Sequence, residues 1–299
     1  MKIVLEDGRV IGSDVLITSI LRWDCVPIVA NFEFQVILDQ QLDKALQVGS
    51  KIFVGKENHT FVIDKRSIFN SSIVRDDKQI NIGAYIAVLK GTEDLIIPKD
   101  GDAIYLKDTS IGRALRAAGV AVAIGDDVPL QRFLCPVGDT PTFPIAKALG
   151  EEAALMFYGR DKKIHIQRLN ALATKEVKHR LSEVDIQWIG SNTKINHTVK
   201  SYQTNNIDGA TIEGDLRGKA VTGFLPNRDA RRAKNLSTVL IRRGVAIKSL
   251  DGDWFGGDVV AVGSKKLVVL TAAHRYDSGI LGEASVTATT VFLAEVVKV

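Results

Sequence analysis

The 299-residue chain carries the segment Gly49-Ser50-Lys51-Ile52-Phe53-Val54-Gly55 and, near its other end, the segment Gly257-Asp258-Val259-Val260-Ala261-Val262-Gly263. In both segments, two glycines six positions apart enclose an apolar strand, and a polar turn then leads to another apolar strand, at 61–63 or 267–270. A duplicated β-barrel would produce this likeness, and so would a chance match between two hairpins. The first explanation predicts two related tube-like barrels in one chain.

Around the first segment, residues 1 to about 90 have the pattern of short strands separated by turns. Phe32, Phe34 and Val36 alternate with polar neighbours, which is the period of a half-buried strand. Asp39 is placed to cap a short helix that Gly49 would end. We therefore predict a half-buried antiparallel sheet with strands at 2–5, 15–22, 31–38, 51–54 and 61–67.

The middle of the chain has helical periodicity. Thr109 is placed to cap a helix that stops at Gly119, and 120–124 has the composition of a strand. A second helix is expected from about 140–143, where proline is tolerated in the first turn. It leads into a hairpin, with strands at 155–158 and 163–169 around a turn at 159–161.

Around the second segment the chain returns to strands, expected at 237–247, 259–262, 267–273 and 284–297. The polar stretch 192–212 is typical of exposed strands or long loops. The predicted fold class is mainly β (α+β), with two tube-like antiparallel β-barrel domains and a small α/β module between them. The domains are expected at 1–100 (N-terminal barrel), 101–172 (α/β helix-hairpin module) and 173–299 (C-terminal barrel).

Composition excludes several classes of protein. The chain is 45% apolar, as in ordinary globular proteins, and has no apolar run long enough for a membrane span or a signal peptide. The formal charge of +4, from 39 basic and 35 acidic residues, is too even for a nucleic-acid-binding domain, so we expect no sequence-specific nucleic acid binding. The basic cluster from Arg228 to Lys234 is interpreted as a solvated face, with a phosphate-facing patch as the alternative. Cys25 and Cys135 are expected to be buried reduced thiols.

A longer stretch resembles a known family. Residues 138–158 begin with Gly138-Asp139-Thr140-Pro141, continue through a helix ending at Glu151-Glu152, and lead into the hairpin described above. This order is similar to the helix-plus-hairpin module of phage tail and baseplate hub proteins, which are related to the hub part of type VI secretion spike proteins. The stretch 263–277, which ends in His274-Arg275-Tyr276-Asp277, resembles the family's final hairpin, and the opening around Val26-Pro27-Ile28 is similar to hubs of contractile-tailed phages. No needle-like β-helix follows in this sequence, so the resemblance implies a spike on a separate chain.

The resemblance implies a structural virion protein. Such hubs are homotrimers that match a sixfold tail tube to a threefold spike, because each chain contributes two barrels. The implied partners are a second and third copy, the tail tube or distal-tail protein, the spike or tip protein and baseplate wedge proteins, with the tape-measure protein as a further candidate. The implied location is the tail tip of a virion, after synthesis in the host cytoplasm. The alternatives are a carbohydrate-binding β-sandwich module for cell-surface recognition and a distal-tail or wedge component.

The enzymatic interpretations have weaker support. The stretch 269–274 resembles the histidine segment of trypsin-like proteases, but only 25 residues follow His274, so a strand-end histidine is the expected role. Glu151 and Glu152 are adjacent and point apart, which favours a solvated or capping role over a glycosidase pair. Asp251-Gly252-Asp253 is interpreted as a tight turn rather than a calcium loop. The remaining histidines lack metal-ligand spacing, so we expect no enzyme, no cofactor and no metal site; they are His59, His165, His179 and His197.

Overall fold

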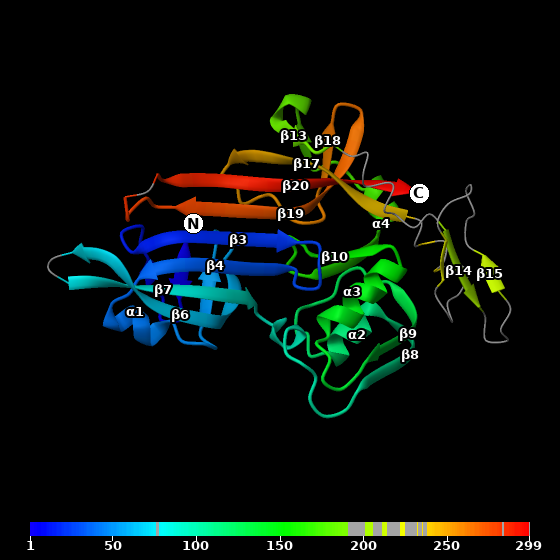
Figure 1. Cartoon of the computed structure of the whole chain (residues 1–299), viewed down its shortest axis with the longest axis horizontal. Helices are drawn as coiled ribbons and strands as arrows, with labels where there is room; N and C mark the ends of the chain where they lie inside the picture. Colours follow the sequence, from blue (N-terminus) through cyan, green and yellow to red (C-terminus); the bar gives the residue numbers. More distant parts are fainter. Residues whose placement is uncertain are drawn as a thin grey trace.

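The computed structural model describes residues 1–75, 78–190, 201–205, 211–213, 222–224, 232, 235, 238–282 and 284–298. Strands dominate these residues and helices are few and short, which confirms the predicted mainly β fold class. The structure joins most of the strands into one large sheet, with the α/β elements on one side of it (Figure 1).

The N-terminal strands follow the predicted alternation. In α1 (Gln40–Ala45), the Asp39 side chain accepts hydrogen bonds from the backbone N–H groups of Gln41 at 2.8 Å and Leu42 at 2.7 Å, which confirms the predicted cap. The strand β7, which returns from the end of β6, was not predicted. The strands are β1 (Ile3–Leu5), β2 (Val10–Ile11), β3 (Leu16–Asp24), β4 (Ala30–Ile37), β5 (Lys51–Val54), β6 (His59–Arg75) and β7 (Lys78–Leu89), and a 3-10 turn η1 (Glu93–Leu95) follows.

The four strands predicted near the C-terminus are all present. They are β17 (Thr238–Ser249), β18 (Val259–Val262), β19 (Lys265–Asp277) and β20 (Val286–Lys298). Before them come β12 (His179–Leu181), a 3-10 turn η2 (Glu183–Asp185) and β13 (Ile186–Trp188). A small separate sheet contains β14 (Ser201–Asn205), β15 (Thr211–Glu213) and β16 (Thr222–Phe224); most of the predicted polar stretch 192–212 lies outside the described residues.

The two β regions share one sheet. Its strands run in the order β13, β17, β20, β19, β3, β4, β7, β6, β5, β1 and β2, with β12 and β18 off this path. The junction is the antiparallel pairing of β3 with the second part of β19, while the first part of β19 pairs with β18. Figure 1 shows β20, β19, β3 and β4 side by side across the molecule.

Both halves of this sheet repeat one pairing order. The first half pairs β5, β6, β7, β4 and β3 in succession, and the second half pairs β18, β19, β20, β17 and β13 in the same way. All four glycines of the two matching segments have positive φ angles, at +88° and +80° for Gly49 and Gly55 and at +82° and +55° for Gly257 and Gly263. This common topology favours duplication over a chance match. The domain boundaries at residues 100 and 172 stay a prediction.

The α/β elements differ from the prediction in four places, one of which is the short helix α4, which was not predicted. The cap of α2 is Ser110, not Thr109, because β8 extends through both residues and Ser110 Oγ accepts from Arg113 N–H at 3.2 Å. Residues 120–124 do not form a strand; Ile124 makes a single bridge to Ile164. The hairpin of β8 and β9 was missed. The elements are β8 (Ile104–Ser110), α2 (Ile111–Ala117), β9 (Pro129–Cys135), α3 (Thr142–Glu151), β10 (Ala154–Tyr158), β11 (Ile164–Arg168) and α4 (Leu169–Thr174).

An aromatic cluster joins the three parts of the chain. The indole of Trp23, on β3, stacks on the rings of Tyr158 at 5.4 Å and Phe255 at 4.9 Å and meets His59 edge-on at 4.9 Å. Trp23 is 2% exposed. The Trp23 side chain therefore contacts both β regions and the α/β hairpin. It lies on the face of the sheet against which that hairpin packs.

Candidate functional site on the open face of the sheet

The sheet has one buried face and one open face. On β3, Leu21 and Trp23 are buried, whereas Thr18, Ile20 and Arg22 on the opposite side are half-buried. The same alternation continues on neighbouring strands, and the register aligns Arg275 of β19, Ile20 of β3, Glu33 of β4, Ile86 of β7 and Lys65 of β6 in one row. We call the side that carries this row, opposite Trp23, the open face.

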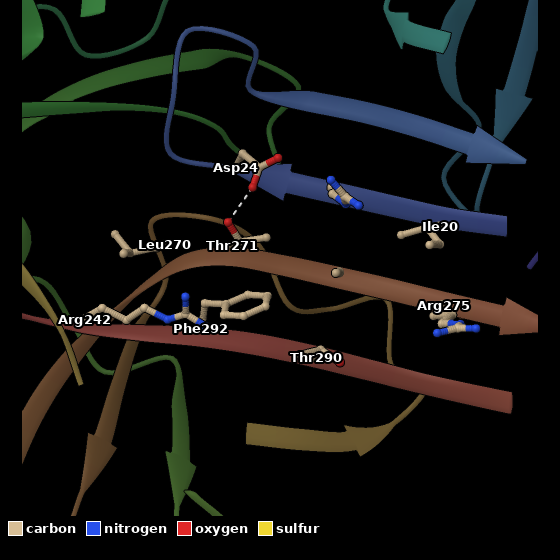
Figure 2. A pocket seen from close by; sticks show the side chains of 10 residues that line it. Ile20, Asp24, Arg242, Leu270, Thr271, Arg275, Thr290 and Phe292 are labelled. Atoms are coloured by element: carbon tan, nitrogen blue, oxygen red, sulfur yellow. Dashed lines mark hydrogen bonds between the residues drawn. The ribbon is translucent and has the colours of Figure 1, made fainter. Parts of the chain in front are cut away.

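Two shallow hollows lie next to each other on the open face and share Ile20. The first, of about 510 Å³, lies over β3, β19 and β20 (Figure 2). The second, of about 520 Å³, lies over β3, β4, β7 and β6. Their linings mix small, apolar and charged side chains, and neither encloses a ligand-sized volume away from solvent. The open face is therefore an extended, solvent-open surface and not an enclosed pocket.

Two cations of the open face have carboxylate partners within the chain, whereas Lys65 is exposed and has none among the described residues. Arg22 Nη2 lies 3.7 Å from Glu33 Oε1 on the next strand, and Arg275 Nη2 lies 2.6 Å from Asp277 Oδ2. The guanidinium of Arg242 lies 4.4 Å from the centre of the Phe292 ring. Burial raises the pKa of Asp24, and a hydrogen bond from the Thr271 hydroxyl partly offsets this effect (Figure 2). The charges of Arg22 and Arg275 are therefore partly neutralised by neighbouring carboxylates on the same face.

His274, the residue that resembles a protease histidine, lies on the buried face. Its Nδ1 is 3.0 Å from Thr289 Oγ1 and its Nε2 is 3.1 Å from the carbonyl oxygen of Trp254, so both ring nitrogens have structural partners. Strand β19 continues to Asp277, so His274 lies within the strand, and the prediction of a strand-end histidine was wrong on this point. At 1% exposure it cannot reach a substrate.

The burial of His274 predicts a pH-dependent stability. Burial lowers the pKa of His274 and also that of His59, whereas the pKa of a histidine in an unfolded chain is about 6.5. When the pH falls through the pKa of the unfolded histidines, the unfolded chain binds protons while the folded chain does not. The free energy of unfolding that both histidines contribute above this pH is therefore lost below it. We expect urea unfolding to give a lower free energy of unfolding at about pH 5.5 than at about pH 7.5. The His274→Gln variant should show a smaller difference between the two values, and an unchanged difference would contradict this assignment.

The paired glutamates are buried, which corrects the solvated interpretation, whereas the capping interpretation holds for Glu152, the C-terminal cap of α3, whose backbone N–H donates to Ala148 O. Glu152 is 0% exposed, and its carboxylate accepts from Arg168 Nη2 at 3.0 Å and from Arg232 Nε at 3.0 Å. Glu151 Oε2 lies 3.8 Å from Arg232 Nη1. Arg232 belongs to the basic cluster 228–234; it is 2% exposed, so for this member the solvated interpretation is wrong. The rest of the cluster lies outside the described residues.

The aspartates near the second glycine segment have structural roles. Asp253 N–H donates to Asp251 Oδ1 at 3.0 Å, which confirms the predicted tight turn. Arg160, from the turn between β10 and β11, donates to Asp258 at 2.7 and 2.9 Å. Burial alone would raise the pKa of Asp258, but hydrogen bonds from His179 and Arg160 outweigh it and lower this pKa. These contacts hold the turn between β10 and β11 against Asp258, the residue that precedes β18.

The remaining candidates are dispersed. Cys25 and Cys135 are buried free thiols, as predicted. His165 bridges Asp126 at 2.8 Å and Asp161 at 2.9 Å, while His197 lies outside the described residues. Within the described ranges, no group of three or more His, Cys, Asp or Glu residues is arranged to hold a metal ion. In the same ranges no helix has the length and apolar character needed to cross a membrane.

Comparison with known proteins gives matches in structure alone. No protein-family model matches the sequence, and no curated protein sequence matches it. The fold is similar to that of a tail protein from Neisseria meningitidis MC58, with a TM-score of 0.64, 10% identity, and coverage of 98% of this chain and 95% of that one. It is also similar to the 43 kDa tail protein of prophage MuSo2 from Shewanella oneidensis, with a TM-score of 0.59, 13% identity, and coverage of 100% and 98%.

A third similar structure comes from a secretion system. It is an E. coli component of the type VI secretion system, described as structurally similar to the T4 bacteriophage tail proteins gp27 and gp5. The TM-score is 0.54, the identity 8%, and the coverage 99% of this chain and 77% of that one. These likenesses confirm, at the level of fold, the resemblance stated from the sequence: this chain has the fold of phage tail proteins and of a type VI secretion component over almost its whole length.

Proposed function

We propose that this chain is a non-enzymatic structural subunit of a phage-type tail, the hub that joins the tail tube to a central spike or tip. The observation that carries the proposal is the match to two tail proteins over nearly the full length of both partners. The repeated pairing order supports it as well, because a hub that adapts sixfold to threefold symmetry needs two equivalent units in each of three chains.

In this arrangement the open face lines the central channel. A channel through which DNA or protein passes must avoid strong fixed contacts, and the ion pairs of Arg22 and Arg275 with carboxylates of this face weaken such contacts. The α/β elements lie on the other side of the sheet, where they would face neighbouring tail proteins such as the wedge or distal-tail subunits. A spike protein and the tape-measure protein are the partners expected at the channel itself.

The sheet offers two edges through which copies could join. Strand β17 pairs with β13 only from Gly244 to Ala246, so most of its outer edge has no strand beside it among the described residues. Strand β6 pairs with β5 only as far as Val62, and beyond it only with β7 among those residues. Two different edges give a head-to-tail contact, which closes into a ring when the rotation fits. We propose that these edges form the seam between copies.

Light scattering on a seam variant tests this proposal. Ile68 and Phe69, on the free part of β6, are 46% and 44% exposed. The double substitution Ile68→Lys and Phe69→Lys should reduce the mass of the purified protein from about three chains to one, because charged side chains on an edge strand oppose strand pairing.

The control is Phe143→Lys, a site 74% exposed at the start of α3, which should leave the mass unchanged. Circular dichroism should show that both variants are folded. A trimer in the seam variant would contradict the seam, and a wild-type protein that is monomeric even with the tube and spike proteins of its own particle would contradict the hub.

The other candidate functions have less support. A carbohydrate-binding surface usually displays aromatic rings, yet Trp23 and Trp254 are buried and Trp188 alone of the three tryptophans is exposed, at 41%. A distal-tail ring would have six copies, so the mass measured by light scattering also separates that function from the hub.

A further inference from the structure

The hairpin of β8 and β9 forms a two-stranded ribbon on the outside of the α/β module, apart from the main sheet (Figure 1). Helices α2 and α3 pack on its inner side, where Ile104, Phe133 and Cys135 are buried. The outer side carries two cross-strand pairs, Tyr105 opposite Leu134 and Lys107 opposite Arg132. We call these four outward residues the ribbon face.

The apolar pair of the ribbon face is open to solvent. Tyr105 is 50% exposed and Leu134 52% exposed, although both are large apolar side chains. Lys107 Nζ lies 5.6 Å from the centre of the Tyr105 ring, so the basic pair borders the apolar pair. Exposed apolar side chains rimmed by charge are typical of protein interaction sites.

The basic pair places two like charges directly opposite each other. Such a pair weakens an isolated hairpin, because the two cations repel across the strands. Among the described residues, neither Lys107 nor Arg132 has a carboxylate within ion-pair distance in the structure. A carboxylate from outside the chain, bound between the two cations, would remove this repulsion and gain two ion pairs.

The ribbon also has free strand edges. Within the described residues, the backbone groups of β8 and β9 hydrogen-bond to each other along the register from Ile104–Cys135 to Ser110–Pro129, and no third strand pairs with either. A free edge accepts an extended segment as an additional strand. Side chains of such a strand alternate between the two faces, so positions two residues apart would both lie on the ribbon face.

We propose that the ribbon face binds an extended segment of another protein in which an apolar residue and an acidic residue stand two positions apart. The apolar residue packs beside Tyr105 and Leu134, and the carboxylate binds between Lys107 and Arg132. The segment adds as a third strand to the ribbon. This inference rests on the ribbon alone and holds whether or not the chain is a tail hub.

Nuclear magnetic resonance titration tests the proposal with two synthetic peptides. The first is a seven-residue peptide with blocked ends, the length of β8. Threonine occupies every second position, and the positions between them carry valine and glutamate in turn, so that these two stand two positions apart. The second peptide has lysine in place of each glutamate. We expect the glutamate peptide to shift backbone amide signals of β8 and β9 in a saturable way that weakens as salt is added. The lysine peptide should bind at least about tenfold more weakly, because it meets like charges at Lys107 and Arg132.

A charge-reversed protein provides the matched control. In the double variant Lys107→Glu and Arg132→Glu the preference should invert, so that the lysine peptide binds and the glutamate peptide does not. An inverted preference cannot come from misfolding, because an unfolded ribbon would bind neither peptide selectively.

Other results would overturn the proposal. These are equal binding of both peptides, shifts located away from β8 and β9, or no shifts at all. Two further measurements address different occupants of the ribbon face. Self-association that increases with protein concentration and is lost in the double variant would assign the face to a second copy of this chain. Binding to vesicles of phosphatidylserine and phosphatidylcholine that is lost in the double variant would assign it to a membrane surface.

Discussion

Replacing Trp23 by alanine should lower the free energy of unfolding by about 4 kcal/mol, the largest effect we expect from one substitution in a core of this kind. The indole is 2% exposed and contacts Tyr158, Phe255 and His59, which come from three separate parts of the chain. Truncation removes its buried apolar area and leaves a cavity that the surrounding rings, each held by its own strand or loop, can fill only in part.

Urea unfolding of the variant, followed by far-ultraviolet circular dichroism, measures this effect. The matched control is Trp188→Ala, since Trp188 is 41% exposed and its loss should cost about 1 kcal/mol or less. A Trp23→Ala protein as stable as the Trp188→Ala protein would show that the aromatic junction does not hold the two β regions and the hairpin together. The junction couples the three parts into one unfolding unit, so the variant should also show a separate unfolding transition at a lower urea concentration.

The strands were predictable where burial alternates along one strand. Phe32, Phe34 and Val36 point to the core while the residues between them lie on the open face, so the pattern of period two is visible in the sequence itself. The cap at Asp39 was predictable for a similar reason, because a local hydrogen bond depends on neighbouring residues alone.

Elements that depend on distant partners were not predictable. In β7 the residues from Ala87 to Leu89 are all buried, so the alternation that marks a half-buried strand is lost there. In β8, Asp108 takes a left-handed φ of 43° and interrupts the alternation, which hides the hairpin with β9. The pairing of β3 with β19 joins residues about 250 positions apart, and no local signal specifies it.

The candidate site shows the same limit. Residues of the open face such as Thr18, Gln35 and Ala273 are small or polar and carry no motif; what unites them is their register across strands from both halves of the chain. The resemblance to tail hubs implied an assembly of three chains, but the face that we propose lines its channel becomes visible only when the strands are aligned. Buried ion pairs are equally hidden, because charged residues in sequence suggest a solvated surface.

Replacing Glu152 by alanine should lower the free energy of unfolding by about 3 kcal/mol. The carboxylate is fully buried and accepts from Arg168 and Arg232, and Arg232 is itself 2% exposed. Removing one partner of a buried ion pair leaves a desolvated charge without the group that stabilised it, which costs more than the pair contributes when intact. The control Glu176→Ala removes an exposed carboxylate and should change stability by less than about 0.5 kcal/mol.

A double-mutant cycle separates this explanation from simple loss of packing. The cost of Glu152→Ala can come mainly from the buried charge of Arg232 that loses the Glu152 carboxylate. In that case, adding Arg232→Leu should recover part of the free energy of unfolding, and the coupling energy of the two substitutions should be about 2 kcal/mol. If the cost comes from lost volume at the end of α3, the two effects should add. Additive effects would mean that Arg232 obtains enough stabilisation from its other contacts, including Glu151 at 3.8 Å, and that the pair does not itself anchor Arg232 to the end of α3.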